Sequence, residues 1–306
     1  YKRQTLVDGR EVALKIRRDD IEQRARQDFV LFKANILPVL RRFSKALDDV
    51  AFAHAENLFI GELDLVREAA NLQRFSEIFK DDPDIVIPQL IPDLCSANCL
   101  TMEYIEGSSL NTFINQAAEE EKVAVARAIL RLVFRSSFGF NLFKTDLYES
   151  NFRINRGKLV ILDFGRVQTI ETSIFQEHLA AVWQGVFQPN HLKLPIPESL
   201  KVVEPQIYEL MEHFVLIHHK FNEPVTFFPD LSEFIDYMLA HTAIYAPMVS
   251  NVKINELDQM QIWLWLGVLM TRLNVKLLWV QEFKALFELY LPDYRPDAPQ
   301  KELASA

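Results

Sequence analysis

The sequence predicts an α+β fold with two lobes: a small N-terminal lobe that contains a sheet and a helical insertion, and a mostly helical C-terminal lobe. Residues 1–16 alternate polar and apolar side chains around Asp8-Gly9, a pattern typical of a β-hairpin. Apolar residues recur at helical spacing over most of the remaining chain. The 306 residues, 49% of them hydrophobic and 25% charged, are enough to form a large core.

The N-terminal lobe is expected to comprise residues 1–105. Its expected elements are, in order, a hairpin over residues 1–16, helices over 17–60, a helix over 61–79, and strands over 86–87 and 100–105. Glu106-Gly107-Ser108 then interrupts the last strand, as a linker between two lobes would.

The C-terminal lobe is expected to comprise residues 106–306. Its expected elements are a helical segment over 108–143, a hairpin formed by 152–154 and 159–162, and helices from 169 onward with breaks at 189–205 and 222–229. The apolar segment Ile262–Met270 is too short to cross a bilayer. We therefore expect a buried helix there, and contact with a membrane is the less favoured alternative.

Composition narrows the function classes. The net charge of −9 argues against general affinity for nucleic acid, so we expect no nucleic-acid partner. The two cysteines, Cys95 and Cys99, have no second pair, which argues against a zinc site and favours a reducing compartment. Some of the 23 phenylalanines could line a pocket for a lipid or a quinone. The chain begins at Tyr1, in what reads as the middle of a strand, so we expect an N-terminally truncated piece.

Three short motifs follow one another in a meaningful order. Lys15 lies on an expected strand over Glu11–Ile16, Asp146 is followed five residues later by Asn151, and Asp163 opens an Asp-Phe-Gly sequence. Each motif alone is weak evidence. Together and in this order they are the parts of a protein-kinase-like phosphotransfer site, so the predicted two-lobed fold is protein-kinase-like.

The chemistry of phosphoryl transfer explains these residue types. The transferred group carries charge on its oxygens, so the protein mainly supplies position and counter-charge. Lys15 would hold the phosphates, and Asn151 and Asp163 have the oxygen atoms that Mg²⁺ prefers. Asp146 would accept the proton of an attacking hydroxyl group or orient it. The expected cofactors are therefore ATP and Mg²⁺.

Lys15 also needs an acidic partner that fixes its side chain. In the expected helix over 61–79, Asp64 and Glu68 are four residues apart and would share one face. Glu68 is the candidate partner of Lys15. The alternative is an exposed, solvated acidic face, which is common on helices.

Five segments together resemble the UbiB family, atypical kinase-like proteins linked to coenzyme Q biosynthesis. The resemblance runs with specific motifs from Tyr1 to Val167. The segments are Glu62-x-Asp64, Arg67-Glu68-Ala69-Ala70-Asn71, Thr101 to Gly107, Thr145-Asp146 with Asn151-Phe152, and Leu162-Asp163-Phe164-Gly165.

The resemblance implies an ATP- and Mg²⁺-dependent kinase or ATPase that supports ubiquinone biosynthesis. It implies the following roles: Lys15 for phosphate binding with Glu68 as its partner, Glu62 and Asp64 as a regulatory acidic pair, Glu103 and Tyr104 at the hinge beside the adenine, Asp146 as the catalytic aspartate, and Asn151 and Asp163 as magnesium ligands. Expected partners are a nucleotide, a lipid or quinone precursor, quinone-biosynthesis proteins and a membrane surface. The expected location is the cytoplasm or membrane periphery of a bacterium, or a mitochondrion or plastid.

Three departures from the family leave other functions open. The sequence lacks the family's Lys-x-Gly-Gln segment and its alanine-rich loop, and Lys144-Thr145-Asp146 stands where many members have His-Ala-Asp. One alternative is a non-catalytic pseudokinase that binds nucleotide, lipid or partner proteins. A less favoured one is a small-molecule phosphotransferase that resembles aminoglycoside or choline kinases, which share the Asp-x4-Asn spacing.

Overall fold

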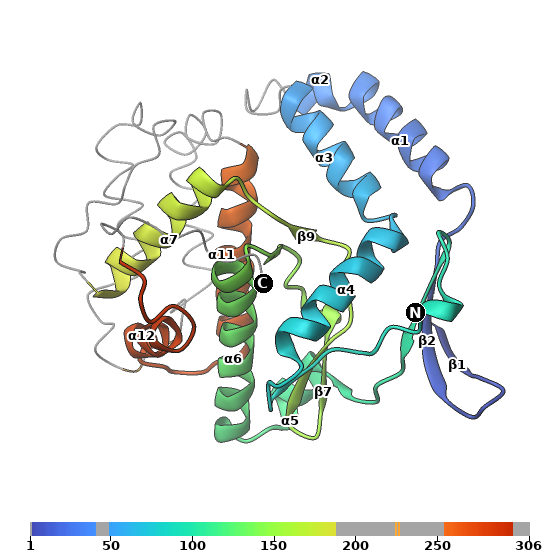
Figure 1. Cartoon of the computed structure of the whole chain (residues 1–306). Helices are drawn as coiled ribbons and strands as arrows, with labels where there is room; N and C mark the ends of the chain where they lie inside the picture. Colours follow the sequence, from blue (N-terminus) through green and yellow to red (C-terminus); the bar gives the residue numbers. More distant parts are fainter. Residues whose placement is uncertain (1, 41–48, 188–223, 225, 227–253, 296–306) are drawn as a thin grey trace. The chain divides into compact units, whose positions relative to one another are not determined.

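A computed structural model of the chain describes residues 2–40, 49–187, 224, 226 and 254–295. The described part combines helices with short strands, as the sequence predicts (Figure 1). Its contacts form two compact units. The first unit comprises Tyr1–Ala117 with Thr145–Val167, and the second comprises Ala118–Lys144 with Gln168–Ala306.

The first unit begins with the predicted hairpin. Strands β1 (Lys2–Thr5) and β2 (Glu11–Ile16) pair antiparallel, and Gly9 in the turn has a φ of 87°, which suits glycine. Strand β4 (Cys99–Glu103) pairs antiparallel with the other edge of β2, giving the order β1-β2-β4. The expected strand over 100–105 is thus present with shifted ends.

Four helices follow β2. They are α1 (Ile21–Asn35), α2 (Leu37–Leu40), α3 (Asp49–Gly61) and α4 (Leu65–Phe79). Helices α1 and α3 contact each other through aromatic rings, with Phe29 at 5.7 Å from Phe52 and 5.5 Å from Phe59 between centroids. The expected helical insertion is therefore divided into several helices.

The start of α4 corrects one prediction. The expected helix over 61–79 begins only at Leu65, because Asp64 is its N-cap: Asp64 Oδ1 accepts hydrogen bonds from Val66 N and Arg67 N, both at 3.0 Å. Asp64 is exposed at the cap, whereas Glu68 is fully buried inside the helix. The two acids therefore do not share one helical face.

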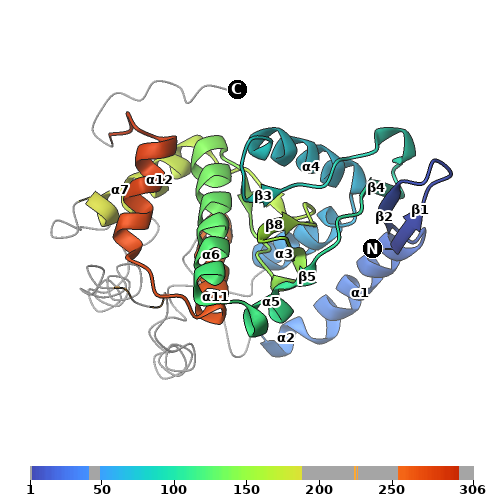
Figure 2. The same ribbon diagram turned by 90° about the horizontal axis from the view of Figure 1, so that it is seen from below.

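A second sheet completes the first unit, in the order β3-β8-β7-β5. Its strands are β3 (Ile85–Val86), β5 (Ser108–Ser109), β7 (Phe152–Asn155) and β8 (Lys158–Ile161). The predicted hairpin β7–β8 turns through Arg156 and Gly157, whose φ angles of 50° and 80° are typical of a type I′ turn. Helix α4 runs beside β3 (Figure 2).

Shorter elements connect these parts of the first unit. They are the 3₁₀ turns η1 (Pro92–Leu94) and η3 (Glu149–Asn151) and the helix α5 (Leu110–Gln116). The contacts group the chain differently from a division at residue 105. Thr145–Val167 belongs with the first unit because its hairpin pairs with both β3 and β5.

The second unit is helical and has an aromatic core. Its helices are α6 (Glu119–Phe134), which continues as a π-helix η2 (Arg135–Gly139), α7 (Thr172–Phe187), α11 (Ile254–Leu273) and α12 (Trp279–Tyr290). The ring centroid of Phe134 lies 5.0 Å from that of Phe138 and 4.8 Å from that of Phe287. Along the sequence, the chain passes from the second unit to the first after β6 (Phe143–Lys144) and back to the second within β9 (Val167–Gln168).

The apolar segment Ile262–Met270 lies within α11, as expected for a buried helix. Ile262, Leu266 and Met270 are each 3% exposed or less. Among the described helices, none combines the length and the apolar character that a membrane span needs. The breaks expected at 189–205 and 222–229 fall in the part of the chain that is not described.

Candidate functional site

Strand β2 places Lys15 in the first unit with its side chain 26% exposed. Its Nζ atom donates to both carboxylate oxygens of Glu68, at 2.8 and 2.7 Å, and to Asp163 Oδ2 at 3.1 Å. Three residues that are far apart in the sequence therefore meet at one ammonium group. The contact joins two of the motifs that the sequence singles out, together with the acidic residue on α4.

Burial and charge compete at this ammonium group. Burial alone would lower the pKa of Lys15, but the carboxylates of Glu68 and Asp163 outweigh burial and raise it. Glu68 is fully buried, and burial together with the nearby Asp163 raises the pKa of its carboxyl group against the opposing effect of Lys15. Lys15 is thus held as a cation.

Asp163 lies in the loop that directly follows β8. Its second carboxylate oxygen, Oδ1, accepts a hydrogen bond from Gly165 N at 2.9 Å. A Cβ atom at position 165 would lie 3.3 Å from Asp163 Oδ1 and 3.7 Å from Glu68 Oε2. The glycine of the Asp-Phe-Gly motif therefore leaves the space in which these two carboxylates approach the loop.

Asn151 and Asp146 form a second contact of the same unit. Asn151 Nδ2 donates to Asp146 Oδ2 at 2.8 Å and to Asp146 O at 3.0 Å. Leu162 N donates to Asn151 O at 3.0 Å, because Asn151 directly precedes Phe152 and Leu162 directly follows Ile161, and these two positions are paired in the β7–β8 hairpin. The hairpin thus holds Asn151 beside Leu162, the residue next to Asp163. The predicted hairpin therefore brings the Asn151 and Asp163 segments together.

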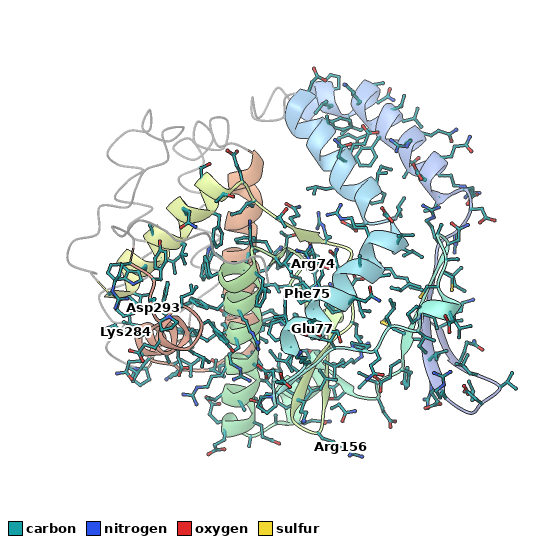
Figure 3. The ribbon with its side chains drawn as sticks, in the orientation of Figure 1. Arg74, Phe75, Glu77, Arg156, Lys284 and Asp293 are labelled. Carbon is teal, nitrogen blue, oxygen red and sulfur yellow. The ribbon has the colours of Figure 1, made fainter. Side chains whose placement is uncertain are left out.

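Helix α4 holds the segment after Asp163 through three side chains at a spacing of four residues. Arg67 Nη2 donates to Val167 O at 2.8 Å and Asn71 Nδ2 donates to Phe164 O at 3.0 Å. The ring of Phe75 lies 5.2 Å from that of Phe164. Phe75 is fully buried, whereas its neighbours on α4 in Figure 3, Arg74 and Glu77, are exposed.

The sequence-based predictions give Arg67 and Asn71 no role in holding this segment. Arg67 and Asn71 belong to the Arg-Glu-Ala-Ala-Asn stretch, where attention falls on Glu68. Their four-residue spacing, continued by Phe75, was the available signal for a contact along one helical face.

Arg166, which directly follows the Asp-Phe-Gly motif, is a further residue that the predictions lack. Its Nε atom lies 2.7 Å from Glu62 Oε1, an ion pair without the alignment of a hydrogen bond. Burial raises the pKa of the Glu62 carboxyl group; Arg166 and Lys15 lower this pKa, whereas the charges of Asp146 and Asp163 raise it. Glu62 is therefore electrostatically coupled to the predicted site residues.

The two members of the predicted acidic pair have different surroundings. Glu62 faces Arg166, whereas Asp64 caps α4 with its side chain. Their shared role remains a prediction.

Glu103 and Tyr104 lie at the end of β4. Glu103 N donates to Gln89 O at 2.8 Å, and Tyr104 N donates to Glu11 O at 3.1 Å. The guanidinium group of Arg3 lies 4.4 Å from the centre of the Tyr104 ring. Their assignment to an adenine-binding hinge stays a prediction.

The oxygen atoms of this site are suited to a hard cation. Within the described residues, no three His, Cys, Asp or Glu side chains form a metal cluster of their own. Mg²⁺ needs fewer protein ligands, because phosphates and water complete its shell. Since the Asn151 amide nitrogen faces Asp146, its Oδ1 atom is the one that could ligate a metal together with Asp163.

The strand lysine, its partner on a helix, the Asp-x4-Asn loop and the Asp-Phe-Gly loop define a kinase-like protein. The sequence pattern of the ABC1 atypical kinase-like domain matches residues 1–195. The chain belongs to the ABC1 atypical kinase-like family. This confirms the UbiB-type resemblance that the sequence motifs carry.

Named relatives agree with this assignment. The mitochondrial atypical kinase COQ8B of Danio rerio is 29% identical over 58% of this chain and 28% of its own length. The chloroplastic Activity of bc1 complex kinase 3 of Arabidopsis thaliana is 30% identical over 54% and 24%. The probable protein kinase UbiB of Xylella fastidiosa is 26% identical over 62% and 36%. The chain thus spans about a quarter to a third of the length of these relatives.

A solved structure shares the fold. The structure described as the complex of Rv3197 with erythromycin from Mycobacterium tuberculosis matches 94% of this chain and 73% of its own, with a TM-score of 0.67 and 20% identity. This similarity concerns the fold alone. Together with the family match it confirms the predicted kinase-like α+β fold.

Proposed function

We propose that this chain is an ATP- and Mg²⁺-dependent atypical kinase or ATPase that supports ubiquinone biosynthesis. The observation that carries the proposal is the meeting of Lys15 with Glu68 and Asp163, in the same unit as the Asn151–Asp146 contact. The quinone pathway follows from the family resemblance. A lipid or quinone precursor, quinone-biosynthesis proteins and a membrane surface are proposed partners on the same basis.

The cofactor assignment is supported by the donor atoms. Asn151 Oδ1 and the Asp163 carboxylate would hold the magnesium ion, because both are hard oxygen ligands. Lys15, charged and fixed by Glu68, would hold the phosphates of ATP. When bound, ATP and Mg²⁺ would supply an activated phosphoryl group whose charge is partly neutralised.

The side chains of this chain would then divide the remaining work. Asp163 would exchange its contact with Lys15 for a contact with the cation, while Gly165 N keeps its Oδ1 atom in place. Asp146 would accept the proton of an attacking hydroxyl or water at Oδ2, the atom that Asn151 Nδ2 orients.

Ligand-induced stabilisation tests the proposal. A ligand that binds the folded state raises the melting temperature by mass action. We expect ATP with Mg²⁺ to raise it in the parent chain and in Asp93→Asn, a control that removes an exposed carboxylate from η1. Asp163→Asn should abolish the Mg²⁺-dependent part of the rise. An unchanged rise in Asp163→Asn would refute the assignment of the site.

A non-catalytic pseudokinase is the second candidate, and one contact favours it. Asp146 Oδ2, the oxygen proposed to accept the proton, already accepts a hydrogen bond from Asn151 Nδ2 at 2.8 Å. If this contact persisted with nucleotide bound, the chain would bind ATP without consuming it. ATP consumption that is lost in Asp146→Asn, while nucleotide binding is kept, would exclude the pseudokinase; binding without any consumption by the parent chain would support it.

A further inference from the structure

The Glu62–Arg166 ion pair lies beside the proposed nucleotide site and has no role in the function proposed above. Glu62 is in the turn between α3 and α4, and Arg166 follows the Asp-Phe-Gly motif. The two side chains are 37% and 22% exposed, and 2.7 Å separate Arg166 Nε from Glu62 Oε1. Because both side chains are partly buried, solvent screens the charges of the pair only in part.

Arg166 also contacts the catalytic loop through its main chain. Thr145 N, directly before Asp146, donates to Arg166 O at 3.1 Å. On the other side, Arg166 is linked through Gly165 to the loop of Asp163, and Glu62 O lies 3.9 Å from where a Gly165 Cβ would be. The pair is therefore in physical contact with both loops that carry the proposed site residues.

The charges near Glu62 make the pair consequential. The carboxylates of Asp146 and Asp163 act on Glu62 electrostatically, and so do Arg166 and Lys15. Without Arg166, Glu62 would add an unneutralised negative charge next to the two aspartates. Without Glu62, Arg166 would be a cation next to the same aspartates and could pair with one of them.

We propose that Arg166 is a positioning residue that neutralises Glu62 and thereby sets the net charge beside Asp146 and Asp163. This charge determines how strongly the site binds a divalent cation and how strongly it binds a metal-free nucleotide. The inference rests on the proposed function for the identity of the nucleotide. The inference gives Glu62 a partner, Arg166, within this chain. The family resemblance separately implies that Glu62 belongs to a regulatory acidic pair with Asp64.

The two halves of the pair should have opposite effects. Arg166→Gln leaves the site more negative, so cation affinity should rise and affinity for metal-free ATP should fall. Glu62→Gln leaves the site more positive, so both changes should reverse. In Glu62→Gln/Arg166→Gln the charge is balanced again, and the affinities should return toward those of the parent chain. A purely structural role would weaken binding in both single variants.

The probe is Mn²⁺, titrated into the nucleotide-free chain and followed by the electron paramagnetic resonance signal of free Mn²⁺. A second titration uses ATP in the presence of a chelator. We expect roughly three- to tenfold shifts in each single variant, the scale of one partly screened charge. The matched control is Glu77→Gln, which removes the same charge from an exposed position of α4 and should leave both affinities unchanged.

Folding is controlled by circular dichroism and by Arg166→Lys. Arg166→Lys keeps the positive charge and should therefore retain the cation affinity of the parent chain. This variant tests the role of the charge in case Arg166→Gln does not fold. The inference would be overturned if both single variants shifted an affinity in the same direction, or if the affinities of the double variant were no nearer to those of the parent chain. It would also be overturned if the parent chain bound no Mn²⁺. Opposite shifts in Mn²⁺ affinity with no ATP binding by the parent would support it and refute only the proposed function.

Discussion

The two units of this chain hold their central residues by different means. In the first unit, charged and amide side chains fix the site, as in the contacts of Lys15 with Glu68 and Asp163 and of Asn151 with Asp146. In the second unit, rings fix the helices, as in the contacts of Phe134 with Phe138 and Phe287. Polar contacts depend on matched charge, whereas ring contacts depend on filled volume. Substitutions in the two units should therefore change stability for different physical reasons.

The largest expected effect is on the aromatic core. Phe134→Ala removes a ring that is 1% exposed, and we expect it to lower the free energy of unfolding by about 3–5 kcal/mol. All four tryptophans, Trp183, Trp263, Trp265 and Trp279, lie in the second unit, so tryptophan fluorescence during urea denaturation reports this unit. Leu289→Ala, at a 62% exposed position of α12, is the control and should change it by less than about 0.5 kcal/mol. Equal effects of the two would contradict the packing argument.

The next effect concerns the buried ion pair of the first unit. Lys15→Met leaves the fully buried Glu68 without its cation, and we expect a loss of about 1–3 kcal/mol. Glu68→Gln in the same chain should restore part of this loss, because the unpaired charge is then gone. Circular dichroism should detect both changes, while the tryptophan transition of the second unit stays in place. If Lys15→Met/Glu68→Gln were no more stable than Lys15→Met, the pairing energy would be negligible.

Short-range turn chemistry explains why both hairpins could be predicted from the sequence. Asp8-Gly9 and Arg156-Gly157 each provide a residue that accepts a positive φ between two strands. Lys15, Asp146 and Asp163 are predicted site residues because phosphoryl transfer would require these residue types in this order. These predictions depend on local patterns or on chemistry, both of which are visible in one dimension.

Two features of the structure could not be predicted from the sequence, one because the local signal is ambiguous and one because it depends on a contact between distant segments. The start of α4 depends on whether Asp64 caps the helix or continues it, and both are compatible with an acidic residue near a helix start. Arg166 gains its importance only because folding brings it to Glu62. Nothing near Arg166 in the sequence marks it as the partner of a carboxylate that precedes it by about a hundred residues.

A smaller effect separates the capping role of Asp64 from its charge. Asp64→Ala removes the acceptor of the Val66 and Arg67 amides, and we expect a loss of about 1 kcal/mol in the stability of the first unit. Asp64→Asn keeps a capping oxygen without the charge and should remain close to the parent in a urea titration followed by circular dichroism. Equal losses in both variants would show that the charge stabilises this helix start more than the hydrogen bonds do.

The smallest expected effect is a pH dependence of stability caused by Glu62. Its pKa is raised in the folded chain, first by burial and then by Asp146 and Asp163, against the opposing effects of Arg166 and Lys15. The folded state therefore holds the proton of Glu62 to a higher pH than the unfolded state does, so this group favours folding less as the pH rises from the ordinary glutamate pKa through the raised one. Glu62→Gln should remove that decline. Urea midpoints of both chains between about pH 4 and 7 measure it: curves that converge at low pH and separate at high pH support the coupling, whereas parallel curves contradict it.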